Sequence, residues 1–405
     1  MTAWRVRKLG GLCDIELGKT PARANKAFWD ERRETDNVWL SIADLLNLED
    51  NVVCDSKEYI SDIGASISKV VSRGTLLVSF KLTLGRLAFA GRDLFTNEAI
   101  AALTIFNERE LSKEFLFYFL HFFDWRKAAE NDVKLKGMTL NKAKLKELSV
   151  PFPPRPEQQR IVGILDEAFD GIATAKANAE KNLQNARAIF DSCLQSAFSK
   201  RGKGWVGTML RTEIDLLAGF AFKSNGYTNS SDSIRLLRGD NIIQGSLRWE
   251  DVKQWPMSEA PEYRRYQLRD GDVVLAMDRP WVKAGLKHAI ISEIDLPCLL
   301  VQRTARLRAG PRMDNRFLMR LIGSAEFTRH ILGVQTGVGV PHISGKQIQD
   351  FQFFRPPLNE QLAIADGFEA LREQTQSLAD VYKRKIAALD ALKKSLLHQA
   401  FSGTL

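Results

Sequence analysis

The sequence predicts an α+β protein in which two pseudo-repeated, mixed α/β globular domains are separated by two long α-helices that form an antiparallel coiled coil. Three observations support this fold class. Sequence signatures recur in the same order in the two halves of the 405-residue chain. A long apolar stripe with helical spacing closes each half, and short β-rich runs alternate with helical patches before it.

The repeat is clearest at the two ends of each long helical stretch. The segment PPRPEQQRI at 153–161 reappears as PPLNEQLAI at 356–364, and Ala197-Phe198-Ser199 reappears at the same offset as Ala400-Phe401-Ser402. Two anchors that keep one offset over about 40 residues leave no room for a net insertion, as expected of a continuous helix. Further upstream, Trp4, Leu9, Asp14 and Gly18 recur as Trp205, Leu210, Asp215 and Gly219.

Each long stretch carries apolar residues at three- and four-residue steps, the pattern of a helix with one buried face. Prolines before each stretch indicate helix starts, and Gly202 and Gly403 indicate helix ends. We expect the two stripes to pair with each other. The predicted pairing residues are Ile161, Leu165, Ile172, Leu183 and Ile189 in the first helix and Ile364, Phe368, Leu371, Leu378, Ile386, Leu389, Leu392 and Leu396 in the second.

Pairing is one of two arrangements open to these helices. About 40 residues at 1.5 Å each form a rod of roughly 60 Å, which outruns the face of a ~150-residue domain. An antiparallel pair would bury both stripes and place the globular parts at opposite ends. The alternative is that each helix packs on its own domain.

Composition is typical of a globular protein. Apolar residues make up 44% and charged residues 26% of the chain, which excludes wholesale disorder. No stretch approaches the ~20 apolar residues that cross a bilayer, and the start MTAWRVRKLGG lacks the apolar run of a signal peptide. We therefore expect a cytoplasmic protein with no membrane partner.

The sequence indicates neither a metal nor a cofactor. Four cysteines are spread along the chain without a C-x-x-C pair, and the five histidines form no metal-ligand spacing with them. The net charge of +9 permits a polyanionic partner. Most of the positive excess lies on the globular parts, whereas the helical stretches are near neutral. A polyanion would therefore bind the globular parts.

The duplicated signatures resemble those of the specificity subunits of type I restriction-modification systems. The P-P-x-x-E-Q helix starts and the Ala-Phe-Ser helix ends are similar to those of the family's spacer helices. Further matches are Gly18-Lys19-Thr20-Pro21, Gly85-Arg86 and the stretches at 39–44, 97–100 and 237–242. The resemblance covers almost the whole chain. It implies target-recognition domains at 1–155 and 204–358, a central spacer helix at 156–203 and a C-terminal spacer helix at 359–405.

This resemblance implies a DNA-binding subunit without catalysis of its own. Each target-recognition domain would read one half of a bipartite site in double-stranded DNA, while the helices set the gap and hold two methyltransferase subunits, with restriction subunits as further partners. The second copy has Gly219-Phe220-Ala221-Phe222 where the first has Gly18-Lys19-Thr20-Pro21. Because the two domains differ in sequence, we expect an asymmetric, interrupted target.

Candidate DNA contacts are the cations and polar residues near the family-like loops. Lys and Arg contact phosphates, and Arg and Lys also read guanine through paired hydrogen bonds. For each residue the simplest alternative is a solvated surface position. The candidates are Lys19, Thr20, Lys81, Arg86, Lys134 and Lys136 in the first domain and Lys223, Arg238, Arg279, Lys283, Lys287, His342 and Lys346 in the second.

Two other classes of function compete with DNA recognition. An amino-methyltransferase would show a glycine-rich cofactor loop after a strand and an Asn/Asp-Pro-Pro-aromatic motif, but Pro153-Pro154 follows Phe152 and opens a helix. Nothing singles out the carboxylate-lysine cluster of a nuclease. The second class is a coiled-coil protein-interaction scaffold without sequence-specific DNA binding. Binding to DNA that weakens steeply with salt would distinguish recognition from a scaffold role.

Overall fold

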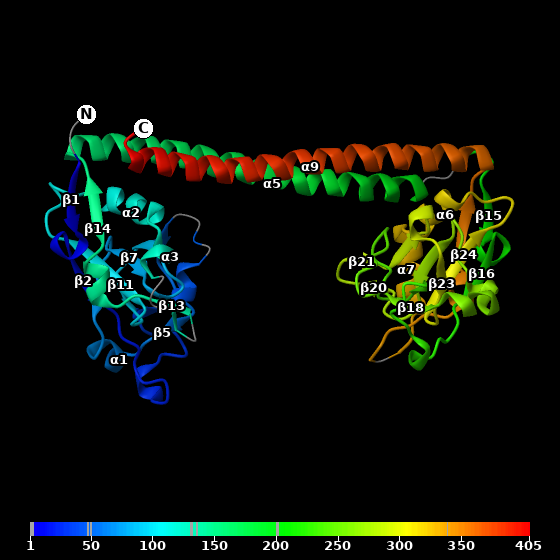
Figure 1. Cartoon of the computed structure of the whole chain (residues 1–405), viewed down its shortest axis with the longest axis horizontal. Coiled ribbons are helices and arrows are strands. Elements are labelled where there is room, and N and C mark those ends of the chain that lie inside the picture. Colours follow the sequence, from blue (N-terminus) through cyan, green and yellow to red (C-terminus); the bar gives the residue numbers. More distant parts are fainter. Residues whose placement is uncertain are drawn as a thin grey trace. The chain divides into compact units, whose positions relative to one another are not determined.

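The computed structural model describes residues 4–46, 48, 51–129, 133–134, 137–199, 202–337 and 339–405, without the side chains of 133–134 and 137–139. Two long helices, α5 (Arg155–Ser199) and α9 (Leu358–Ser402), have 45 residues each. The chain divides into unit 1, Met1–Ala179 with Arg384–Leu405, and unit 2, Glu180–Lys383. Each unit therefore contains one globular part and a segment of each long helix (Figure 1).

The globular part of unit 1 consists mainly of short strands. The strands are β1 (Arg5–Lys8), β2 (Cys13–Leu17), β3 (Val38–Leu40), β4 (Val52–Val53), β5 (Glu58–Tyr59), β6 (Val70–Val71), β7 (Leu76–Ser79), β8 (Lys81–Leu82), β9 (Leu87–Ala90), β10 (Leu94–Thr96), β11 (Ile100–Ile105), β12 (Val133–Lys134), β13 (Gly137–Thr139) and β14 (Ser149–Phe152). The helices are α1 (Asp62–Ser66), α2 (Lys113–Phe122), α3 (Trp125–Ala128) and α4 (Lys142–Lys146). The sheets have the orders β2-β11-β7-β9-β4, β5-β3-β10-β6, β12-β13-β8 and β1-β14.

The main core of unit 1 packs around α2. The Ser112 hydroxyl caps this helix by accepting a hydrogen bond from the backbone N–H of Phe115 at 3.0 Å. The sequence of α2 is apolar on almost every face, and six consecutive residues from Phe115 to Leu120 are buried. The same cluster includes Leu165 of α5 and Leu397 of α9. Segments of both long helices therefore belong to the core of unit 1.

Phe401, near the end of α9, joins an aromatic cluster on α2. Its ring centroid lies 5.4 Å from that of Phe115, 5.7 Å from that of Phe119 and 5.4 Å from that of Phe122. We expect Phe401→Ala to destabilise unit 1 by about 2 kcal/mol, because a half-buried ring is lost from this cluster. The thermal midpoint of unit 1 should fall by about 4–8 °C. The control is Leu392→Ala, at a position of α9 that is 47% exposed; equal shifts in both variants would contradict the prediction.

Unit 2 has a second set of short strands and helices. The strands are β15 (Val206–Met209), β16 (Ile214–Ala218), β17 (Ser233–Leu237), β18 (Lys253–Pro256), β19 (Val273–Ala276), β20 (Trp281–Val282), β21 (Gly285–Leu286), β22 (His288–Ile290), β23 (Cys298–Leu300), β24 (Thr304–Ala309) and β25 (Gln352–Arg355). The helices are α6 (Asn315–Ile322), α7 (Ala325–Val334) and α8 (Gly345–Gln349). The sheets have the orders β16-β24-β19-β22, β18-β17-β23, β15-β25 and β20-β21. Phe317 of α6 and Phe327 of α7 are fully buried in its main core.

The strand pairing repeats from one unit to the other. The antiparallel pairs β1-β14 and β2-β11 of unit 1 correspond to β15-β25 and β16-β24 of unit 2. A parallel pair follows in each unit, β3-β10 in the first and β17-β23 in the second. The predicted fold class, two pseudo-repeated mixed α/β parts with two long helices, is confirmed.

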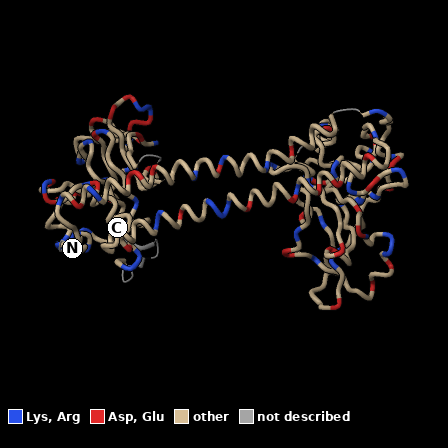
Figure 2. Tube along the Cα trace, turned by 90° about the horizontal axis from the view of Figure 1, so that it is seen from above, with Lys and Arg blue, Asp and Glu red and all other residues tan. Residues whose placement is uncertain are grey.

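In unit 1 the segments of α5 and α9 run antiparallel. The Lys176 ammonium of α5 donates a hydrogen bond to the Asp390 carboxylate of α9 at 2.8 Å. Phe169 lies about two turns before Lys176 on α5, and its ring centroid is 4.7 Å from the ammonium of Lys393. Lys393 lies about one turn after Asp390 on α9. Partners therefore advance in opposite directions along the two helices. In Figure 1 the two helices lie side by side, and Figure 2 shows acidic and basic residues interspersed along both.

Fewer residues are buried along the two long helices than the predicted apolar stripes contain. The predicted pairing residues that are buried or half-buried are Ile161, Leu165, Ile172, Leu183, Ile364, Phe368, Leu371, Ile386, Leu389 and Leu396. Contrary to the prediction, Ile189, Leu378 and Leu392 are exposed. A straight helix drifts by about 20° per heptad, so a regular apolar stripe rotates away from a narrow seam. Alanines at 179, 186 and 379 are buried instead.

The glutamine of each P-P-x-x-E-Q motif joins a long helix to the globular part of its unit. Gln158 is fully buried, and its side-chain oxygen accepts a hydrogen bond from the Ser112 backbone N–H at 2.9 Å. Its side-chain nitrogen donates to the carbonyl oxygens of Glu110 and Pro153 at 2.8 and 2.9 Å. In unit 2 the equally buried Gln361 makes the matching bonds to the Asp314 N–H and to the carbonyl oxygens of Arg312 and Pro356.

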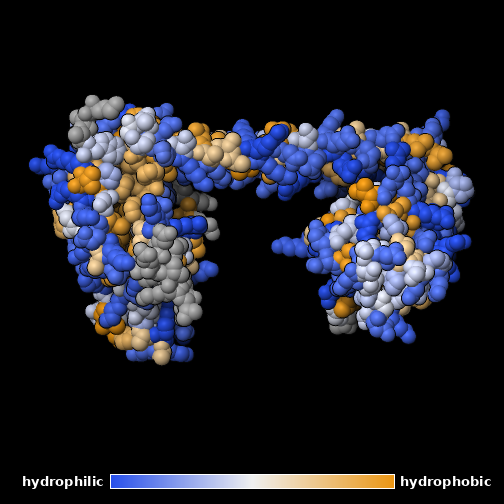
Figure 3. All heavy atoms as spheres, viewed as in Figure 1, coloured by the Kyte–Doolittle hydropathy of each residue, from blue (hydrophilic) through white to orange (hydrophobic). Residues whose placement is uncertain are grey.

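The face of the molecule drawn in Figure 3 is mostly hydrophilic, with hydrophobic residues in scattered groups. Across the described ranges, no helix combines the length and the apolar character that a membrane crossing requires. This holds for α5 and α9 as well, because polar and charged residues occupy most of their exposed positions.

Candidate nucleic-acid interface

Unit 2 contains a pocket of about 370 Å³ whose lining includes four cations. Arg238 follows strand β17, Arg279 follows β19, Lys287 precedes β22 and Arg303 precedes β24. We call these four residues the basic pocket. Four separate segments therefore bring their positive charges to one place.

Tight backbone turns position two of the arginines. Arg279 and Arg303 have φ angles of +44° and +66°, in the left-handed region that favours glycine. The Arg279 backbone N–H donates to the Pro341 carbonyl at 2.7 Å, and the Arg303 carbonyl accepts from the Met277 N–H at 2.8 Å. A left-handed non-glycine residue costs roughly 1–2 kcal/mol, and such strain concentrates at functional sites. The neighbouring loops thus impose the conformation of both arginines.

Acidic residues offset only part of the positive charge of the basic pocket. Two carboxylates also line it: Asp240 lies 3.4 Å from Arg238 Nη2, and Asp278 lies 3.6 Å from Arg303 Nε. Burial lowers the pKa of the Lys287 ammonium, and the charges of Arg248 and Arg279 lower it further, although Asp240 opposes them. The positive charges are therefore close enough to repel one another, and an anion would relieve this repulsion.

The lowered pKa of Lys287 predicts a pH dependence of anion binding. As the pH rises above neutrality toward 10.5, the ordinary value, Lys287 loses its proton before an unperturbed lysine does. We expect affinity for DNA to fall over this range by about 1 kcal/mol more in the wild-type chain than in Lys287→Arg, because a guanidinium stays charged. Binding titrations at constant ionic strength measure the difference. Identical pH profiles for both proteins would rule out a role for this ammonium.

The structure separates the residues predicted for unit 2 into two groups. Arg238, Arg279 and Lys287 lie together in the basic pocket. His342 lies beside it, because its backbone forms a β-bridge with Asp278. The other three predicted residues are exposed and do not line the pocket: Lys223, Lys283 at the β20-β21 turn, and Lys346 in α8.

In unit 1 several predicted residues gather around Glu98. The backbone N–H of Lys19 donates to the Thr96 carbonyl at 2.8 Å, and the neighbouring Thr20 hydroxyl donates to the Glu98 carboxylate. This hydrogen bond lowers the pKa of Glu98, and the positive charges of Lys81 and Arg23 lower it further. We call Lys19, Thr20, Arg23, Lys81 and Glu98 the loop face of unit 1.

The remaining predicted residues of unit 1 are only partly described. Arg86 is exposed at the turn after β8, where its backbone N–H donates to the Ser79 hydroxyl at 2.9 Å. Lys134 belongs to strand β12, but its side chain lies outside the described residues, as does the whole of Lys136. Strand β12 pairs with β13, which pairs with the β8 strand of Lys81. Residues 133–134 therefore belong to the same three-stranded sheet as Lys81.

Repeated glycines start the corresponding loops of the two units. A Cβ atom on Gly18 would lie 2.1 Å from the Thr96 carbonyl oxygen, and one on Gly219 would lie 2.1 Å from the Val301 carbonyl oxygen. Both glycines therefore permit a close approach of two backbone segments that a larger residue would prevent. Lys19 and Thr20 follow the first glycine, and Arg303 lies two residues after Val301, between strands β23 and β24. The loop face and the basic pocket thus occupy corresponding regions of the repeated fold.

Sequence reasoning missed Arg23 and Arg303. The signal for Arg303 lies in the strand registers, since Leu17 pairs with Ala101 and the equivalent Ala218 pairs with Ala305. These registers align Arg303 with the family-like stretch at 97–100, which was already singled out. Arg23 lies just beyond the Gly18-Lys19-Thr20-Pro21 signature, and nothing in its sequence neighbourhood distinguishes it from the other surface arginines.

Comparisons with known proteins point to one family. The model for the type I restriction modification DNA specificity domain matches residues 1–184. The specificity subunit of the type I restriction enzyme EcoAI from Escherichia coli is 37% identical over 182 residues, which cover 45% of this chain and only 30% of that protein. The MjaVIII specificity subunit from Methanocaldococcus jannaschii is 24% identical over 425 residues, covering 99% of this chain and 93% of that protein.

Solved structures share the fold over the whole chain. A chain from a structure that addresses complex assembly and conformational transition of the type I R-M system has a TM-score of 0.74 at 17% identity, covering 100% of this chain and 98% of that one. The HsdS subunit from Thermoanaerobacter tengcongensis has a TM-score of 0.61, also at 17% identity, covering 100% and 97%. At this identity the likeness establishes the fold alone.

Proposed function

We propose that this chain, which belongs to the type I restriction-modification specificity subunits, recognises a specific double-stranded DNA site in two parts. One globular part reads each half of the site. The observation that carries the proposal is the placement of cations in corresponding regions of a repeated fold: the loop face of unit 1 and the basic pocket of unit 2. Cations of this kind contact phosphates and read guanine.

The two half-sites differ in sequence under this proposal. Lys19 and Thr20 follow the glycine of unit 1, whereas aromatic residues, Phe220 and Phe222, follow the glycine of unit 2. Different side chains in corresponding regions form different hydrogen bonds with base edges. We therefore propose an asymmetric target, with base pairs between the halves that neither unit reads.

The long helices have the role of spacer and docking surface in this proposal. We assign target recognition to 1–155 and 204–358 and spacer helices to 156–203 and 359–405. The helices set the distance between the half-sites and hold two methyltransferase subunits, with restriction subunits as further partners. The interspersed charges on α5 and α9 suit contacts with protein better than contacts with a polyanion (Figure 2).

Catalysis belongs to the partner subunits in this proposal, and the whole complex acts in the cytoplasm. The competing interpretation is a coiled-coil scaffold whose globular parts do not read DNA. The basic pocket argues against it, because a protein-binding surface has no general need for four cations around one opening.

Salt dependence distinguishes the two functions. We expect the complex of this chain with its methyltransferase subunits to bind target DNA with a log affinity that falls linearly with log salt, by about 0.9 for each phosphate contacted. The methyltransferase subunit alone is the control. A slope that the chain does not steepen beyond the control would favour the scaffold.

A further inference from the structure

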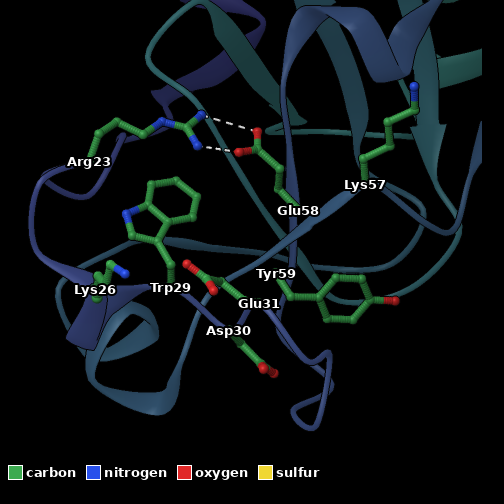
Figure 4. A pocket seen from close by; sticks show the side chains of 8 residues that line it. All are labelled: Arg23, Lys26, Trp29, Asp30, Glu31, Lys57, Glu58 and Tyr59. Carbon is green, nitrogen blue, oxygen red and sulfur yellow. Dashed lines mark hydrogen bonds and ion pairs between the residues drawn. The ribbon is translucent and has the colours of Figure 1, made fainter.

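Arg23 is held over two tryptophan rings in unit 1. Its guanidinium carbon lies 4.0 Å from the ring centroid of Trp29 and 4.8 Å from that of Trp39. Figure 4 shows Arg23 beside Trp29. The two indoles meet edge to face, with centroids 5.1 Å apart, and Trp39 is buried. A planar guanidinium stacks well on aromatic faces, which restricts its motion.

The same tryptophans also fix the backbone of the loop that carries Arg23. The indole N–H of Trp39 donates to the Lys19 carbonyl at 3.0 Å, and that of Trp29 donates to the Ala22 carbonyl at 3.3 Å. Backbone and side chain are therefore both held in place before any ligand arrives. Such preorganisation reduces the entropy lost on binding.

Glu58 occupies one edge of the guanidinium and leaves another free. Its carboxylate accepts hydrogen bonds from Nη1 and from Nη2, the latter at 3.1 Å. Glu58 therefore occupies the edge of the guanidinium that these two nitrogens form. Figure 4 shows both bonds. The remaining edge, formed by Nε and the outer N–H of Nη2, has no hydrogen-bond partner among the described residues. The Arg23 side chain is 53% exposed, so more than half of it is accessible to solvent.

The surroundings of Arg23 continue the loop face toward a pocket of about 380 Å³. Its charge acts on Glu98, as does that of Lys81. Lys26 and Lys57 line the pocket as well, together with the carboxylates of Asp30 and Glu31. Asp30 is engaged elsewhere, because it accepts hydrogen bonds from the Thr35 backbone at 2.7 Å and the Thr35 hydroxyl at 2.9 Å.

We propose that Arg23 reads a guanine in the half-site of unit 1, an inference that rests on the proposed DNA-recognition function. Two parallel N–H groups on one guanidinium edge match the O6 and N7 acceptors that guanine presents in the major groove. Glu58, Trp29 and Trp39 are the positioning residues that aim this edge. A phosphate contact would need only the charge of Arg23, whereas base reading needs the oriented fork.

The test is genome-wide mapping of methylated positions by the complex of Arg23→Lys with its methyltransferase subunits, compared with the wild-type complex. Lysine keeps the charge but lacks the two parallel N–H groups of the guanidinium edge. We expect discrimination to fall by roughly 5- to 140-fold at one G·C position of the first half-site, with every other position read as before. The matched control is Arg32→Ala in the following loop, which removes an arginine that is 85% exposed.

Each other outcome overturns the inference. An unchanged motif with Arg23→Lys excludes base reading and leaves Arg23 at most a phosphate contact, because lysine keeps the charge. An equal loss at all positions contradicts the reading of a single base pair by Arg23. Loss of the whole first half-site assigns it to the folding of unit 1, which a lowered thermal midpoint would show independently. If the wild-type complex itself yields no motif, the proposed function has failed, whatever Arg23 does.

Discussion

The double variant Arg279→Ala/Arg303→Ala is expected to bind target DNA roughly 100-fold more weakly than the wild-type chain, a loss of about 3 kcal/mol, with both proteins in complex with methyltransferase subunits. The reason is the charge balance of the basic pocket. Without these two guanidinium groups, Arg238 and Lys287 face Asp240 and Asp278, so the lining loses its positive excess. Fluorescence anisotropy at several salt concentrations should also show a slope smaller by about 1–2.

The control for this variant is Lys253→Ala. Lys253 is an exposed cation in β18 of the same unit and does not line the pocket. Alanine has the same Cβ as arginine, so the left-handed backbone at 279 and 303 is no more strained in the double variant than in the wild type. If the double variant and Lys253→Ala bind equally well, the basic pocket is not part of the DNA interface.

Gln158→Leu is expected to destabilise unit 1 by about 3 kcal/mol or more, because it leaves one backbone N–H and two carbonyl groups without partners in a buried site. The thermal midpoint of unit 1 should fall by about 6–12 °C. Hydrogen exchange should accelerate at the Ser112 amide, which loses its acceptor. Gln361→Leu should have the same effect on unit 2, because Gln361 makes the matching three bonds.

The next residue provides the control. Gln159 is exposed on the same turn of α5, so Gln159→Leu should change stability by no more than about 0.5 kcal/mol. A similar loss of stability in both variants would mean that replacing either glutamine at the helix start has the same cost. The buried bonds of Gln158 would then have no special structural role.

The long helices could be predicted because their signals are local. Apolar spacing and duplicated helix ends are both visible in the sequence, and α5 and α9 follow them. The width of the pairing was harder to predict, since Ile189, Leu378 and Leu392 continue the apolar pattern but lie exposed. Burial at the seam depends on how far each helix has rotated, which a residue pattern does not record.

The candidate site was only partly predictable for a different reason. Arg238, Arg279 and Lys287 stand near recognisable loops, but their proximity involves two sheets. Arg279 and Lys287 adjoin the neighbouring strands β19 and β22 of one sheet, whereas Arg238 follows β17 of the sheet β18-β17-β23. Arg303 became apparent from the strand register, and Arg23 from its tryptophan contacts. Likewise, the Gln158 motif was visible as a repeated pattern, whereas the three buried backbone groups that it satisfies come from distant segments.

The most direct test of the central claim is to co-express the wild-type chain with its methyltransferase subunit and map methylated positions across a host genome by modification-sensitive sequencing. The account predicts a single interrupted motif whose two halves differ, one for each unit. A stable complex that methylates no defined motif, or one that methylates a single uninterrupted site, would contradict it.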